Sequence, residues 1–197
     1  MKIYEKSLKQ IKKSFGLPYL ALHKINKLSV LIFKNTNLLK NTSIEIRTDE
    51  FFLQQTQKNI FNRFDTIVRL LAIENFYNKN NFGWELYKKM QANRVSPDYI
   101  NKSVDIFKKL IISWEGKGYQ KESKIICDKK LQLVDGSHRL ALSIFFKNKY
   151  LSCTVLPYKE NIKYDLKWFI EHDFTLEEIN LIDKKYIEIC NQYKQSI

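Results

Sequence analysis

The chain has 197 residues and a formal net charge of +13 at neutral pH. Its hydrophobic content of 44% and aromatic content of 14% exclude a disordered chain, and its length suits one domain of ordinary size. The longest apolar run, at 29–33, is too short to span a bilayer, and the first residues lack the apolar stretch of a secretory signal. We therefore expect a cytoplasmic protein without a membrane span.

Lysine supplies most of the positive charge. Of the 34 basic residues, only five are arginines: Arg47, Arg63, Arg69, Arg94 and Arg139. Together with a richness in Asn and Ile, this mixture indicates a bias of composition, and basic charge alone gives only non-specific affinity for nucleic acids. Nucleic acid is therefore the less favoured partner. The arginines are more informative than the lysines, because a guanidinium binds a carboxylate or phosphate with two parallel hydrogen bonds.

The pattern of the sequence divides the chain into three parts. Residues 1–40 are predicted to form a helical and irregular extension, with a short basic helix at 2–14 and a strand at 28–33. The main domain is expected at 41–160, and helices are expected at 161–197.

The main domain is expected to begin with a strand at Ile44–Arg47, where apolar and polar residues alternate. Thr48 or Asp49 would cap a helix that follows. From about 51 to 90, apolar residues recur at three- and four-residue spacings, which is the pattern of helices with one buried face. We therefore predict a helical insertion at about 51–100.

The clearest pattern lies in the second half of the domain. A helix opened by a proline is expected at 97–113. Strands at 124–127 and 131–134 would form a hairpin, and a final strand is expected at 151–156. Between them, 137–147 is apolar on nearly all sides, which predicts a buried helix.

The C-terminal part is predicted to be helical. A short helix is expected at 165–171, and Thr175–Glu178 has the pattern of a capping box that opens an amphipathic helix. The fold class that follows is α+β: a small mixed sheet, one buried helix after a tight turn, and added helices at both ends.

The turn Asp135–Arg139 is the strongest candidate for a functional site. A strand that passes directly into a helix leaves the first N–H groups of that helix without intrahelical partners. Gly136 has no Cβ, so the turn can take a positive φ and a ligand can approach the backbone closely. The N–H groups and side chains of Ser137, His138 and Arg139 would then bind a phosphate. Asp135 would hold Mg²⁺ through water, orient a donor or act as a base.

A purely structural turn is the alternative, since Asp and Ser often cap helices. The functional interpretation is favoured because an otherwise apolar helix opens with Ser137, His138 and Arg139 together. Buried polar groups of this kind need partners.

The segment Val134–Ala141, with the sequence VDGSHRLA, follows Phe107-x-x-Leu110-Ile111-x-Ser113 and Gly118-Tyr119. In these residues the chain resembles the ParB/sulfiredoxin-like superfamily, over about 103–157. The resemblance implies a turn that binds nucleotide phosphates: ATP in sulfiredoxin, CTP in ParB, and ADP or ATP in free serine kinases.

The branches of this superfamily differ within the turn. Sulfiredoxin has its essential Cys directly after the Gly, where this chain has Ser137, and ParB has a second Arg where this chain has His138. Free serine kinases have Asp-Gly-His with an Arg two residues after the His. Asp135, Gly136 and Arg139 match that pattern, while the His is displaced by one position. The resemblance therefore implies phosphotransfer rather than reduction.

A second candidate site is the segment Arg63–Arg69. On a helix, Asp65 and Arg69 are four residues apart and pair, while Arg63 lies on another face. One interpretation is a solvated ion pair. In the other, Arg63 and Arg69 bind an anionic acceptor and Asp65 takes its hydroxyl proton. Three further carboxylates are equally suited to act as the base: Glu45, Asp49 and Glu74.

Together with these residues, the resemblance implies an ADP- or ATP-dependent kinase or phosphotransferase with Mg²⁺ and a small polar metabolite as acceptor, in surface-polysaccharide, amino-acid or sugar metabolism. Asp135 and Asp65 are the predicted catalytic residues, and Tyr119 is predicted to stack on the nucleotide base. The alternative is a ParB-like nucleotide- or DNA-binding module without catalysis.

Overall fold

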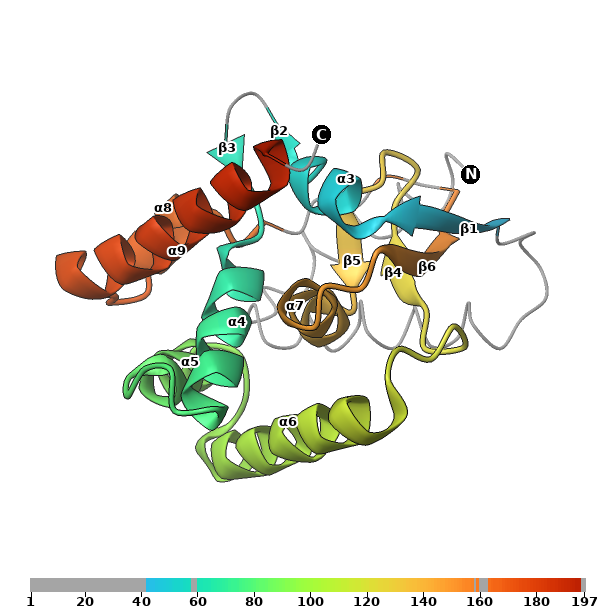
Figure 1. Cartoon of the computed structure of the whole chain (residues 1–197). Helices are drawn as coiled ribbons and strands as arrows, with labels where there is room; N and C mark the ends of the chain where they lie inside the picture. Colours follow the sequence, from blue (N-terminus) through green and yellow to red (C-terminus); the bar gives the residue numbers. More distant parts are fainter. Residues whose placement is uncertain (1–41, 58–59, 158, 160–162, 196–197) are drawn as a thin grey trace, which may run out of the picture. The chain divides into compact units, whose positions relative to one another are not determined.

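The computed structural model describes residues 42–57, 60–157, 159 and 163–195. The helix predicted at 2–14, the strand predicted at 28–33 and the rest of the predicted extension 1–40 lie outside the described residues. In the described part of the chain, seven helices (α3 to α9) accompany a four-stranded mixed sheet and a two-stranded sheet (Figure 1). The predicted α+β class is thus confirmed.

Four strands form the mixed sheet: β1 (Thr42–Arg47), β4 (Ile125–Cys127), β5 (Leu133–Asp135) and β6 (Tyr150–Val155). Their order is β1-β6-β4-β5; β6 is antiparallel to β1 and parallel to β4, and β4 and β5 form the predicted antiparallel hairpin. Because β5 is the outer strand and ends at Asp135, the turn that follows it lies at the edge of the sheet.

The buried helix predicted after the turn is confirmed as α7 (Ser137–Phe145). Leu140, Ala141 and Leu142 have no exposed surface, as expected for a helix that is apolar on nearly all sides. Figure 1 shows α7 end-on, between the sheet and α4 (Phe64–Phe76), and both α4 and β4 contact it. One end of α7 therefore carries the turn, while its other end lies near the start of β6.

The remaining helices surround this core. They are α5 (Gly83–Ala92), α6 (Pro97–Lys117), α8 (Leu166–Ile170) and α9 (Leu176–Lys194). The proline predicted to open α6 stands at its first position, although the helix runs four residues beyond the predicted end. The capping box of Thr175 and Glu178 is present at the start of α9, with both reciprocal hydrogen bonds.

The helical pattern predicted from about 51 to 90 is interrupted. Helix α3 (Thr48–Leu53) is followed by the hairpin of β2 (Thr56–Gln57) and β3 (Ile60–Phe61) before α4 begins. Arg47, rather than Thr48 or Asp49, is the residue that precedes α3.

A buried glutamine explains this interruption. The Nε2 of Gln55 donates to the carbonyls of Phe51, at 2.7 Å, and Leu131, at 3.0 Å, and its Oε1 accepts from the N–H of Leu133 at 2.8 Å. Its amide thus ends α3 and ties the chain to β5, because a buried amide is stable only with its partners satisfied. These contacts are long-range, so the local spacing of apolar residues does not reveal them.

Candidate functional site

The turn between β5 and α7 needs glycine for two reasons. Gly136 has φ +109°, in the left-handed region, and it stands directly before the first residue of α7. A Cβ at this position would lie 2.7 Å from Cγ2 of Ile125 on β4, which is closer than van der Waals contact. The positive φ predicted for Gly136 is confirmed. The turn thus brings the backbone at the start of α7 close against β4.

The outer side of the turn carries an ion pair that is open to solvent. Nη2 of Arg139 lies 3.4 Å from Oδ2 of Asp135, and Nη1 of Arg139 donates to the carbonyl of Lys124. The Asp135 side chain is 43% exposed and that of Arg139 is 21% exposed. Both groups can therefore reach a ligand that binds at the start of α7.

The side chain of Ser137 points the opposite way, into the protein. Its hydroxyl donates to Oδ2 of Asp65 at 3.0 Å and accepts from Nη2 of Arg63 at 2.6 Å. Ser137 is buried, so its hydroxyl anchors the turn to the start of α4. The two candidate sites predicted from the sequence are therefore in contact. Arg63 and Ser137, which form this hydrogen bond, are 74 residues apart in the chain.

Asp65 is the centre of a buried charge cluster. Three guanidinium groups approach its Oδ2: Arg63 at 2.9 Å, Arg69 at 3.0 Å and Arg94 at 3.9 Å. The Asp65 side chain has no exposed surface, and those of Arg63 and Arg69 are 2% and 3% exposed. The predicted pairing of Asp65 with Arg69 is confirmed, whereas the interpretation as a solvated pair is wrong.

The placement predicted for Arg63 is also wrong. Arg63 stands before α4 rather than in it, with φ −135° and ψ 39°, so its side chain turns back toward Asp65 instead of leaving on another face. Its Nη1 donates to the carbonyl of Leu133 on β5 at 2.8 Å. Arg63 therefore connects the sheet, α4 and the turn.

The charges in this cluster fix the protonation state of Asp65. Burial alone would raise the pKa of Asp65, but Arg63, Arg69 and Arg94, together with the hydrogen bond from Ser137, lower it below its ordinary value. Burial lowers the pKa of Arg69 to about 10, and the nearby Arg94 and Arg63 act in the same direction. Asp65 thus stays ionised at neutral pH and is a weak base.

His138 lies on the inner side of the first turn of α7. Its Nε2 is 2.9 Å from the hydroxyl of Tyr87 on α5, and its ring packs edge-on against Phe107 of α6, with ring centroids 4.4 Å apart. The contacts hold the imidazole toward α5 and α6. Arg69 also lies near the ring of Tyr87, so the histidine and the buried cluster share a neighbour.

The other predicted residues lie elsewhere. The Tyr119 hydroxyl accepts a hydrogen bond from the N–H of Ser152 on β6, and its ring packs against Trp114. Glu45 of β1 forms an ion pair with Lys121 at 3.4 Å. These contacts give both side chains partners within the fold and none with the turn.

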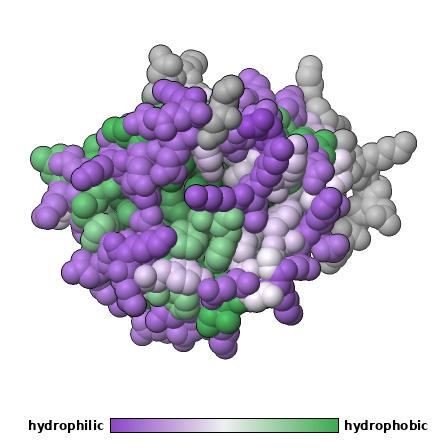
Figure 2. Space-filling view, in the orientation of Figure 1, coloured by the Kyte–Doolittle hydropathy of each residue, from purple (hydrophilic) through white to green (hydrophobic). Residues whose placement is uncertain are grey.

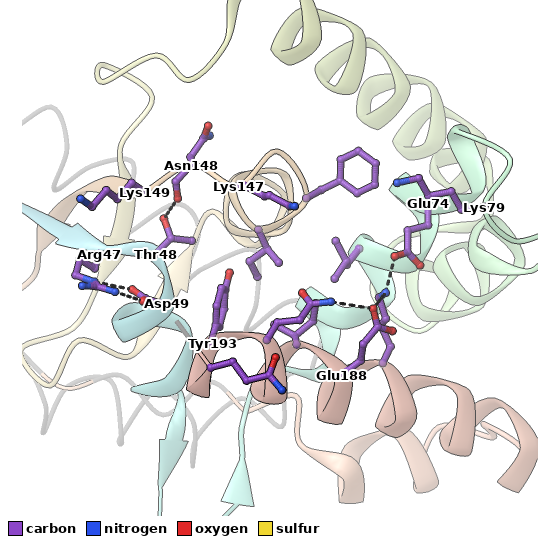
Figure 3. A pocket seen from close by; sticks show the side chains of 17 residues that line it. Arg47, Thr48, Asp49, Glu74, Lys79, Lys147, Asn148, Lys149, Glu188 and Tyr193 are labelled. Atoms are coloured by element: carbon purple, nitrogen blue, oxygen red, sulfur yellow. Dashed lines mark hydrogen bonds and ion pairs between the residues drawn. The ribbon is translucent and has the colours of Figure 1, made fainter. Parts of the chain in front are cut away.

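Asp49 and Glu74 line a cavity of about 880 Å³ that also contains the last residues of α7, Ile144 and Phe145 (Figure 3). Because the turn lies at the first residue of the same helix, this cavity and the turn are separate places. The two carboxylates therefore cannot serve as bases at the turn.

The sequence assigned no role to two residues at this site: Arg94, near Asp65, and Tyr87, which bonds to His138. Arg94 had one usable signal, since it is one of only five arginines, and it lies 4.4 Å from the ring centroid of Tyr164. Tyr87 gave no signal, because a tyrosine in an amphipathic helix is usually a packing residue.

Asp135 is the carboxylate at the turn that could hold a metal ion. The described residues contain no cluster of three or more His, Cys, Asp or Glu side chains arranged to bind one. A single exposed carboxylate fits Mg²⁺, which keeps several waters and uses one or two carboxylates together with substrate phosphates. None of the helices in the described part of the chain is both long and apolar enough to cross a membrane.

Comparisons with protein-family models, with curated proteins and with solved structures find no match to this chain.

Proposed function

We propose that the chain binds ADP or ATP at the turn Asp135–Arg139 and transfers a phosphoryl group to a hydroxyl of a small polar metabolite. The observation that carries the proposal is the left-handed glycine turn: Gly136 at φ +109° opens α7 beside the exposed pair of Asp135 and Arg139. A helix start of this kind binds phosphate through its N–H groups and its dipole.

The residues of the turn have different roles in this proposal. Arg139 supplies the positive charge that binds phosphate, and the N–H groups of the first turn of α7 add hydrogen bonds. Asp135 would hold Mg²⁺ through water, and the ion would neutralise charge on the phosphates. Ser137 and Asp65 position the turn from behind, because their side chains already bond to each other and to Arg63. Asp65 is thus assigned a positioning role instead of the role of base.

The reaction balances with ATP or with ADP as donor. The bond between the terminal phosphorus and its bridging oxygen breaks, and ADP or AMP leaves with the bonding electrons. A new bond forms between that phosphorus and the acceptor oxygen, whose proton passes to Asp135 or to water. Such a step needs positioning and charge neutralisation more than covalent chemistry by the protein.

A ParB-like binding module without catalysis is the second candidate. It is favoured by the internal partners of Ser137, His138 and Asp65, which leave Asp135 as the exposed carboxylate of the turn. This module would bind a nucleotide and release it unchanged. If DNA is its partner, binding weakens steeply as salt rises.

The first test is a thermal-shift panel of ADP, ATP, CTP and GTP with Mg²⁺, on the wild type, Arg139→Ala and Lys130→Ala. Lys130 is exposed in the β4–β5 connection, so its variant removes the same charge away from the turn. A nucleotide at a hundred times its Kd adds about 2.7 kcal/mol of stability. We expect one nucleotide to raise the Tm of the wild type and of Lys130→Ala, and to leave that of Arg139→Ala unchanged.

Phosphorus NMR then separates the two candidates. With the bound nucleotide and a panel of sugar and amino-acid acceptors, a kinase produces a phosphate ester and the shortened nucleotide. A binding module leaves every phosphorus signal unchanged. If no nucleotide raises the Tm of the wild type, both candidates are wrong and the turn is structural.

A further inference from the structure

The cavity at the far end of α7 is a second place where a ligand could bind. Its volume of about 880 Å³ lies within the range of small-molecule sites. Residues from the start of α3, from α4, from the end of α7 and from the second half of α9 line it (Figure 3). At 1.5 Å per residue, the last turn of α7 lies about 12 Å along the helix from Gly136.

One wall of the cavity is a chain of ion pairs between α4 and α9. Nζ of Lys185 lies 2.6 Å from Oε1 of Glu74 and 2.8 Å from Oε1 of Glu188. Lys185 is 12% exposed and Glu74 is 17% exposed, so both are fixed in place but still accessible. Lys185 thus forms ion pairs with two carboxylates at once. Because an ionised carboxylate only accepts hydrogen bonds, this wall suits a ligand that carries hydroxyl groups.

Away from this wall, the cavity is basic. Lys147 and Lys149, which follow α7, line it there, whereas Lys79 lies beside Glu74 (Figure 3). None of the three lysines forms an ion pair in the part of the chain that the structure describes. Lys79 lies over the ring of Phe145 at 4.6 Å from its centroid, and Lys149 lies over Tyr150 at 5.4 Å. Lys147 and Lys149 are exposed, so this side suits an acidic group.

Between the two sides the cavity offers apolar and hydroxyl surface. Leu70, Ile144 and Ile189 line it, and the face drawn in Figure 2 has apolar surface gathered at its centre within a hydrophilic surround. The Tyr193 ring stands in this region with its hydroxyl toward the cavity (Figure 3). Burial raises the pKa of Tyr193, so the hydroxyl stays protonated and can donate a hydrogen bond.

We propose that this cavity binds a small polyhydroxylated molecule with one acidic group, such as a sugar acid or a sugar phosphate. The acidic group lies against Lys147 and Lys149, and the hydroxyls donate to Glu74 and Glu188. The site is separate from the turn Asp135–Arg139, and its occupancy does not depend on nucleotide binding there.

Calorimetric titration with four probes tests the assignment: glucose 6-phosphate, glucuronate, glucose and inorganic phosphate. Glucose 6-phosphate and glucuronate separate a phosphate from a carboxylate as the acidic group. Glucose carries the hydroxyl groups without an acidic group, and inorganic phosphate is an acidic group without the sugar hydroxyls. We expect at least one acidic sugar to bind the wild type, with an affinity at least about tenfold above that of glucose or phosphate alone.

Matched variants locate the binding. Lys147→Gln/Lys149→Gln removes two charges from the cavity, and Lys109→Gln/Lys117→Gln removes two exposed charges from α6. We expect the first double variant to weaken binding of the acidic sugar about tenfold and the second to leave it unchanged. Arg139→Ala should also bind like the wild type. The proposal is overturned if neither acidic sugar binds, or if both double variants bind it with equal affinity.

Discussion

The two ends of helix α7 each bring cations and carboxylates together, but at very different depths. At the first residue, Asp65, Arg63 and Arg69 are almost fully excluded from water behind Ser137. At the last residues, Glu74, Lys185 and Glu188 lie along an open cavity. The two clusters therefore contain the same kinds of charged group but differ in their access to water.

Burial decides what each cluster can do. A buried ion pair gains little net stability, because removing both charges from water is costly, but losing one partner is strongly destabilising. The cluster at Asp65 thus fixes the position of Ser137 and of the turn. An accessible cluster contributes little to stability and keeps its groups available to a ligand. This difference predicts a ranking of mutational effects.

The largest effect is expected for Asp65→Asn. The variant keeps the shape of the side chain but leaves Arg63 and Arg69 buried without their counter-charge, which costs about 3–5 kcal/mol. Denaturant unfolding of the wild type and the variant measures this loss. Asp105→Asn, on the exposed face of α6, is the control and should change stability by less than about 0.5 kcal/mol.

Two further measurements test the cause of that loss. Asp65→Asn/Arg69→Met also removes one of the buried guanidinium groups that Asp65→Asn leaves without a counter-charge, so it should be more stable than Asp65→Asn alone. Because the folded-state pKa of Asp65 lies below its unfolded value, its contribution is present above about pH 4 and is lost as the pH falls through the folded pKa. Asp65→Asn should therefore lose less stability on acidification than the wild type. A double variant no more stable than Asp65→Asn would show that the charge is not the cause.

The second largest effect is expected for Gly136→Ala. The new Cβ meets Ile125 at 2.7 Å in a backbone conformation that alanine avoids, and strain with overpacking costs about 2–4 kcal/mol. Gly116→Ala is the control, since a Cβ there meets nothing within 4 Å and the residue is helical. It should stabilise the protein by about 0.5–1 kcal/mol. Equal melting temperatures for the two variants would show that position 136 does not require glycine.

The turn at the start of α7 and the start of α9 were predictable from the sequence, because both depend on residues that are close together in the chain. Asp135-Gly136 between a strand and an apolar helix specifies the turn, and the spacing of Thr175 and Glu178 specifies the start of α9. Each depends on neighbours within a few residues, where backbone geometry and capping chemistry act.

The features that were missed depend on contacts between distant segments. Gln55 ends α3 through bonds to residues of the β4–β5 hairpin, and Arg63 reaches Ser137 across 74 positions. The ion pair of Asp65 was predicted to be solvated, but it is buried. A sequence indicates burial only through the periodicity of its apolar residues, and that pattern does not show where charged side chains lie. The cavity was equally hidden, since its lysines cannot be told apart from the many others in this chain.

Of the substitutions at the two ends of α7, Lys185→Gln is expected to have the smallest effect, and the response of that effect to salt sharpens the comparison. The variant leaves Glu74 and Glu188 without their shared cation, but both remain accessible to water, so the loss is about 0.5–1 kcal/mol. Salt screens accessible charges and hardly affects buried ones. Raising the salt from about 0.05 to 0.5 M should therefore shrink the difference between Lys185→Gln and the wild type.

The difference caused by Asp65→Asn should stay nearly constant over the same range of salt. Lys88→Gln, which breaks the exposed pair with Glu85 at 2.8 Å, provides the solvent-exposed reference and should cost about 0.3–0.5 kcal/mol at low salt. Denaturant unfolding of the three variants at both salt concentrations gives the comparison directly. If the loss in Lys185→Gln is as large and as insensitive to salt as that in Asp65→Asn, the cluster at the cavity is buried in solution. A ligand could then not reach Glu74 and Glu188, and the sugar site would have to be abandoned.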